Sequence, residues 1–114
     1  MNNIQKGKIG ESIALKYLIN NKAHILETNY RIKSGEIDII AKINEELVFI
    51  EVKSRSNIKF GYPSESVNHK KMKKIINTAK YYILKHNLNN VSIRFDVIEV
   101  YLKDKKINHI VNAF

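Results

Sequence analysis

The chain has 114 residues, of which 44% are hydrophobic, so it can build one hydrophobic core and is too short for two comfortable domains. We therefore expect one domain over residues 1–114, and the formal net charge of +9 favours a polyanionic partner. The sequence contains no cysteine, which excludes disulfides, thiolate metal sites and a thiol nucleophile.

The first half of the chain predicts one helix and three strands. Apolar residues at helical spacing predict an amphipathic helix from Ile4 to Asn21. A short strand from Ile25 to Arg31 follows, and a turn at 33–35 leads into a second strand from Glu36 to Ile43. The third strand, Leu47 to Lys53, is apolar on both faces until its end, as in the centre of a sheet.

The second half predicts a loop, a helix and two strands. Ser54 to Ser66 contains the only proline and few periodic apolar residues, which indicates a loop. A helix is predicted from Ser66 to His86, a strand from Val91 to Leu102 and a last strand from Ile107 to Val111. The order α-β-β-β-α-β-β predicts an α/β domain with a sheet flanked by helices. No apolar run approaches the length of a membrane span and the start lacks an apolar signal segment, so we expect a cytoplasmic protein without membrane contact.

Charged residues stand out on two neighbouring predicted strands. Side chains two apart on a strand share a face, so Glu36 shares a side with Asp38, and Glu51 shares a side with Lys53. Glu51 and Lys53 lie at the carboxyl end of an otherwise apolar strand, where ligand sites are common. A buried charge there is costly unless it is paired or binds a metal.

Two carboxylates from adjacent strands suit Mg²⁺ or Mn²⁺, which leave positions for water and phosphate. With a neighbouring lysine, such a site is equipped for phosphodiester hydrolysis. The plainer alternative is that Glu51 and Lys53 form one ion pair at the rim of the sheet.

Several spaced motifs in one order resemble the YraN family. They are Gly10-Glu11, Asn29-Tyr30-Arg31, Gly35-Glu36-Ile37-Asp38-Ile39-Ile40-Ala41, Phe49-Ile50-Glu51-Val52-Lys53-Ser54-Arg55, Gly61-Tyr62-Pro63 and Arg94-Phe95-Asp96-Val97-Ile98. That family is similar in turn to the PD-(D/E)XK superfamily, which has the restriction-endonuclease-like fold, and especially to archaeal Holliday junction resolvases. The resemblance therefore implies a restriction-endonuclease-like mixed sheet flanked by helices.

The resemblance also implies roles for individual residues. Asp38 stands at the first acidic position of the superfamily, and Glu51-Val52-Lys53 stands at its (D/E)XK element. Asp38 and Glu51 would hold the metal with the backbone carbonyl of Val52, and Lys53 would serve the attacking water. Glu11 matches the extra acidic residue of the resolvase-like branch, as a further ligand. Ile37 precedes Asp38 where the motif name has a proline.

The sequence leaves alternatives open for two of the acidic residues. Glu11 projects near Leu18 on the border of the buried helix face, yet a carboxylate in a first helical turn is also favoured by the helix dipole. Glu36 is either a carboxylate that does not bind the metal itself but orients Lys53 or a water, or a solvated residue after the turn at Gly35.

Basic residues flank the predicted site. On strand ends and loops they would contact phosphates without reading sequence, and they are Arg31, Lys33, Arg55 and Lys59. A second group crowds the second helix, where a plain solvated face is the interpretation that we favour: Lys70, Lys71, Lys73, Lys74 and Lys80. The four histidines share no face or ligand spacing, which argues against a zinc site.

The sequence thus predicts a metal-dependent endonuclease that acts on DNA, with branched or structured DNA implied by the resemblance alone. A symmetric four-way junction would require a two-fold homodimer. The main alternative is a non-catalytic nucleic-acid-binding module that keeps the nuclease fold. A further alternative is a structural or interaction protein whose charge reflects composition, which predicts nucleic-acid affinity that is weak at physiological salt.

Overall fold

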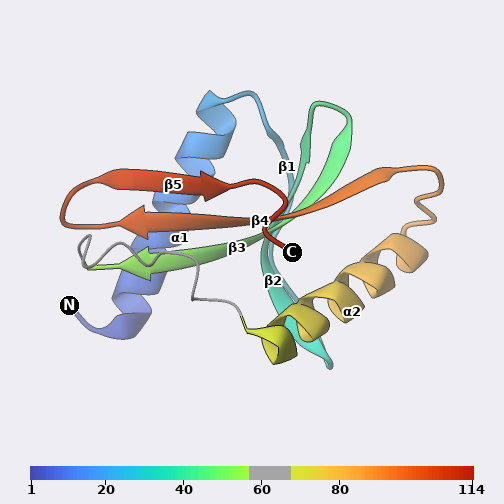
Figure 1. Cartoon of the computed structure of the whole chain (residues 1–114), viewed down its shortest axis with the longest axis horizontal. Coiled ribbons are helices and arrows are strands. Elements are labelled where there is room, and N and C mark those ends of the chain that lie inside the picture. Colours follow the sequence, from blue (N-terminus) through green and yellow to red (C-terminus); the bar gives the residue numbers. More distant parts are fainter. Residues whose placement is uncertain (57–67) are drawn as a thin grey trace.

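The computed structural model describes residues 1–56 and 68–114, which form one five-stranded sheet with a helix on each face (Figure 1). In chain order the elements are α1 (Asn3–Asn20), β1 (His24–Ile32), β2 (Gly35–Ile43), β3 (Glu46–Arg55), α2 (His69–Lys85), β4 (Ser92–Tyr101) and β5 (Lys106–Ile110). This confirms the predicted order. No helix in these two ranges is both long and apolar enough to cross a membrane.

The sheet is mixed, with the strands in the order β1-β2-β3-β4-β5. Only β3 and β4 run parallel, and they pair continuously from Glu46↔Ser92 to Arg55↔Tyr101. All other neighbours are antiparallel. Because α2 connects the two parallel strands, it crosses one face of the sheet (Figure 1). β3 ends at Arg55, two residues beyond the predicted end, and most of the predicted loop lies outside the described residues.

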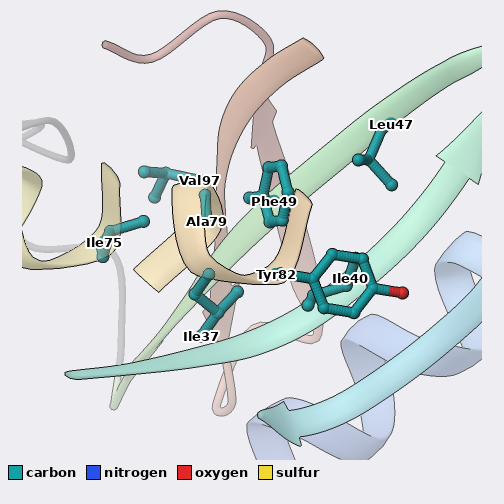
Figure 2. Close-up of a cluster of buried hydrophobic side chains, with 8 residues drawn as sticks. All are labelled: Ile37, Ile40, Leu47, Phe49, Ile75, Ala79, Tyr82 and Val97. Carbon is teal, nitrogen blue, oxygen red and sulfur yellow. The ribbon is translucent and has the colours of Figure 1, made fainter. Parts of the chain in front are cut away.

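β3 divides the core into two halves, as its sequence predicted. Leu47 and Phe49 pack beneath α2, whereas Val48 and Ile50 pack beneath α1. Figure 2 shows the α2 half, in which helix residues lie over strand residues of β2, β3 and β4. A strand that is apolar on both faces is thus buried between two helices.

α1 lies close against β3 because two of the three buried residues on its contact face are small. Gly10 and Ala14 are buried with Leu18, at intervals of four residues along one helix face. A Cβ atom built on Gly10 would lie 1.7 Å from Oγ of Ser54 on β3. Glycine at this position therefore allows α1 to approach the carboxyl end of β3, which carries the predicted site.

α2 begins at a capped terminus and packs through one apolar stripe. The side chain of Asn68 accepts a hydrogen bond from the backbone N–H of Lys71, which satisfies one of the free donors of the first turn. Ile75, Ala79 and Tyr82 are buried against the sheet (Figure 2). The first turn of α2 consequently lies beside the carboxyl end of β3.

Candidate active site where two strands diverge

The candidate site lies where β2 and β3 separate. Their pairing stops at Ile39 and Ile50. One residue beyond, the carboxylate of Asp38 accepts a hydrogen bond of 2.8 Å from the backbone N–H of Val52. Ile37 packs beneath α2 and Ile39 beneath α1, so the strand alternation breaks at Asp38. The carboxylate of Asp38 thus accepts the hydrogen bond that a backbone carbonyl of β2 would accept in a continuous sheet. As a result, the acidic side chain of Asp38 lies in the gap between the two strands.

The gap brings two acidic side chains together. Glu51 on β3 is only 5% exposed, and its carboxyl group is hydrogen-bonded to that of Asp38. Burial, followed by this hydrogen bond and the charge of Glu51, raises the pKa of Asp38 to about 8, although the Val52 N–H opposes the shift. Asp38 therefore keeps its proton to a higher pH than a solvent-exposed aspartate does.

Two lysines approach the same oxygen of Glu51. Lys53 Nζ lies 3.7 Å from Oε2 of Glu51, and Lys71 forms a direct ion pair with that oxygen. Burial and the neighbouring Lys71 lower the pKa of Lys53, against the opposing effect of the acidic pair. Burial is the largest single influence on Lys71 and disfavours its charged form, but its hydrogen bond to Glu51 and the charges of Glu51 and Asp38 together outweigh burial and raise its pKa.

These groups line an open cavity of about 490 Å³. α1 supplies Lys6 and Glu11, and α2 supplies Lys71 and Lys74. Burial raises the pKa of Glu11, with a smaller opposing effect from a hydrogen bond to Asn29. The cavity thus has an acidic floor and a rim of lysines, which suits a phosphodiester substrate that carries its own negative charge.

The structure brings all of the predicted acidic residues to this cavity. Glu11, Glu36, Asp38 and Glu51 line it together with Val52 and Lys53. Glu36 forms an ion pair with Arg31 and has no described contact with Lys53. The predicted role of Glu36 in orienting Lys53 therefore stays a prediction.

The predicted phosphate-binding residues lie farther out. Arg31 and Lys33 are exposed and are not among the lining residues. Arg55 does not line the cavity either, since its guanidinium is 3.4 Å from the buried carboxylate of Glu99. Lys59 lies outside the described residues.

Sequence reasoning missed three lysines of the cavity, Lys6, Lys71 and Lys74. The solvated-face interpretation of the α2 lysines is right for Lys70, Lys73 and Lys80, which are exposed. It is wrong for Lys71, whose side chain is 44% exposed and pairs with Glu51. The available signal was helical spacing, because Lys71 stands four residues before Ile75 and therefore on the buried stripe.

The donor set fits a hard divalent ion held by few protein ligands. Asp38 and Glu51 present carboxylate oxygens in contact with one another, and a cation between them would relieve their repulsion. The carbonyl of Val52 points to the same side as its N–H, toward Asp38, because both groups of one strand residue face one neighbour. Within residues 1–56 and 68–114, no three His, Cys, Asp or Glu residues are grouped closely enough to hold one ion. Glu11 as a third ligand remains a prediction.

Comparison with known proteins places the chain in a family. The model of the uncharacterised protein family UPF0102 matches residues 10–100. The chain belongs to the UPF0102 family. A UPF0102 protein of Clostridioides difficile is 68% identical over 114 residues, which is 100% of both chains. One from Persephonella marina is 48% identical over 109 residues and covers 96% of this chain and 92% of its own. The resemblance to the YraN family, which is this same family, is confirmed.

Among solved structures, SfsA of Pyrococcus furiosus in complex with Ca²⁺ is similar to this UPF0102 chain with a TM-score of 0.39 and 18% identity. The match covers 95% of this chain and 62% of the SfsA chain.

Proposed function

We propose that this UPF0102 chain is a metal-dependent endonuclease that hydrolyses phosphodiester bonds in DNA. The observation that carries the proposal is the contact between the carboxyl groups of Asp38 and Glu51 in a cavity that Lys53 also lines. A protein that only bound DNA would gain nothing from a buried and a half-buried carboxylate facing phosphate. They are useful once a divalent cation joins them.

Each proposed role follows from the position of the side chain. Asp38 and Glu51, with the Val52 carbonyl, would hold Mg²⁺ or Mn²⁺. When bound, such an ion supplies Lewis acidity toward the phosphate and toward the attacking water. Lys53 follows Glu51 on the same face, so its ammonium group can orient that water or donate to the phosphate oxygen that gains charge.

The rim of the cavity supports a nucleic-acid substrate. Lys6 and Lys74 stand on opposite helices beside the acidic pair, where they can contact phosphates on either side of a scissile bond. Such contacts do not read sequence, which fits a substrate chosen by shape. We extend the proposal to branched DNA, and for a symmetric four-way junction to a two-fold homodimer.

The proposal is tested by incubating labelled single-stranded, duplex, flap and four-way-junction DNA with Mg²⁺, Mn²⁺ or EDTA. Asp38→Asn and Glu51→Gln, which change charge with little change of shape, should abolish the metal-dependent products. Glu45→Gln is the matched control, because Glu45 is a carboxylate with a side chain 91% exposed. Products that persist in EDTA or in both site variants would refute the proposal.

A second candidate function is a DNA-binding module without catalysis. It is favoured by the ion pair between Lys71 and Glu51, which neutralises a buried carboxylate without any metal. This candidate predicts salt-dependent DNA binding, no cleavage on any substrate, and affinity that is unaffected by EDTA.

A further inference from the structure

The carboxylate of Glu51 already has a cation bound to it. Oε2 of Glu51 forms an ion pair with the ammonium group of Lys71 and lies 3.7 Å from the ammonium group of Lys53. The carboxylate is 5% exposed and its other neighbour is the acidic group of Asp38. A further cation that binds Oε2 must therefore share this oxygen with two ammonium groups or replace one of them, and a cation that binds Oε1 still meets their repulsion.

The two lysines differ in how firmly they are held. Lys53 extends from β3, whose backbone is paired with β4 at Glu99, and its side chain is 24% exposed. Lys71 extends from the first turn of α2, and its side chain is 44% exposed. A long side chain at the cavity mouth can turn into solvent once its ion pair is broken, so Lys71 is the ammonium group that can leave.

We infer that Lys71 is an internal counterion that occupies the cation position at Glu51 and is displaced when a divalent ion binds there. The inference rests on the proposed function, since it concerns the same metal site. A divalent ion in contact with Glu51 would repel both ammonium groups, and Lys74 lines the same cavity and adds to the positive field. Lys71 thereby opposes metal binding and keeps the acidic pair neutralised when no metal is bound.

Removal of Lys71 should strengthen metal binding. In titration calorimetry with Mn²⁺ and no DNA, we expect Lys71→Met to bind the ion about tenfold more tightly than the wild type, because the competing ion pair is gone. Lys71→Arg, which keeps the charge, should retain the weaker affinity.

Lys74→Met is the matched control, because Lys74 lies one turn along the same helix and lines the cavity without a described ion pair to Glu51 within residues 1–56 and 68–114. Its Mn²⁺ affinity should change much less than that of Lys71→Met. The cap of α2 survives both changes, since Asn68 accepts from the backbone of Lys71 and not from its side chain. Circular dichroism and thermal unfolding establish that each variant is folded.

A second measurement follows the displacement itself. Metal and lysine compete, so by reciprocity the metal must release the lysine. Acetylation of Lys71 by a small amine-reactive reagent, followed by mass spectrometry, should become faster when Mn²⁺ saturates the wild type. A rate that is unchanged or slower with Mn²⁺, or equal Mn²⁺ affinity of Lys71→Met and wild type, would overturn the inference.

The outcomes separate this inference from the proposed function. If the wild type binds Mn²⁺, Glu51→Gln does not, and Lys71→Met binds no more tightly, only the counterion role is wrong. If neither wild type nor Lys71→Met binds Mn²⁺ at millimolar concentration, the metal site is absent and both proposals fall.

Discussion

Two aspartates on the sheet occupy opposite chemical environments. Asp96 on β4 is fully buried, and it accepts hydrogen bonds from Arg94, from His109 at 2.7 Å and from the backbone N–H of Asn112. Burial alone would raise the pKa of Asp96, but these donors outweigh it and the pKa is lowered. Asp38 has one backbone donor and an acidic neighbour, and its pKa is raised to about 8.

The difference separates a structural carboxylate from one available for chemistry. The donors to Asp96 belong to β4, to β5 and to the segment after β5, and His109 is bonded on its other side to the hydroxyl of Tyr17 on α1. The fold satisfies Asp96 completely and uses it to join distant elements. Asp38 retains unused acceptor capacity at a cavity, which is the state expected of a ligand for a cation.

The largest expected effect concerns activity. Asp38→Asn should reduce metal-dependent DNA cleavage at least about a hundredfold, because it removes a charged oxygen ligand from a transition state that gains negative charge. Its free energy of unfolding should be unchanged or higher, since the change removes a poorly compensated acidic group. Initial cleavage rates and urea unfolding of the same preparation test both statements. A stable variant with near wild-type cleavage would remove Asp38 from the site.

Asp96→Asn should show the reverse pattern. The change removes the buried partner of the Arg94 guanidinium, whose side chain is 11% exposed, and leaves only the more exposed Glu46 to pair with it. We expect a loss of about 3–5 kcal/mol in the free energy of unfolding, as for other broken buried pairs. Cleavage per folded molecule should be retained. Glu46→Gln, which removes the more exposed partner of Arg94, should cost about 1 kcal/mol or less. Equal losses in the two variants would contradict the structural role of Asp96.

The opposite pKa shifts predict opposite dependences of stability on pH. Between the ordinary aspartate pKa of 3.8 and about 8, the folded chain keeps a proton at Asp38 that the unfolded chain has released. The contribution of Asp38 to the free energy of unfolding therefore falls as pH rises through this window. The contribution of Asp96 is present above pH 3.8 and is lost as pH falls through its lowered pKa.

Urea unfolding at several pH values, without metal, resolves the two effects. Asp38→Asn should lose the decline that the wild type shows between about pH 4 and pH 8. Saturating Mn²⁺ should suppress the decline in the wild type, since metal binding favours the deprotonated pair. Identical pH profiles for wild type and Asp38→Asn would show that Asp38 does not hold the proton.

The sequence predicted the Asp38 region better than the Asp96 region. Alternation along β3 placed Glu51 and Lys53 on one face, and the family resemblance added Asp38 and Glu11. Nothing in the spacing of Asp96 and His109 indicated a contact, because it depends on the pairing of β4 with β5. The break of alternation at Asp38 was equally hidden, since it arises where β2 leaves β3. Tertiary pairing, unlike strand periodicity, is not encoded within one segment.

The position of α2 over the Asp38 region should respond to a change at Gly35. A Cβ atom built on Gly35 would lie 2.8 Å from Oγ1 of Thr78 and 3.3 Å from the backbone oxygen of Lys74. Gly35→Ala must therefore displace the Thr78 side chain or the backbone of α2 at Lys74, on the helix that carries Lys71. We expect a loss of about 1–2 kcal/mol in the free energy of unfolding.

Thr78→Ala supplies the partner for a double-variant cycle. It removes the hydroxyl that the new methyl group would meet. The double variant should therefore lose less stability than the sum of the losses in the two single variants.

Nuclear magnetic resonance gives the spatial test. Gly35→Ala should shift the signals of Lys71 at the cavity and leave those of the His109 ring unchanged, because that ring contacts α1 on the other face of the sheet. Shifts of similar size at both positions would mean that the two aspartate regions are mechanically coupled, and the contrast between them would then hold for their hydrogen bonding alone.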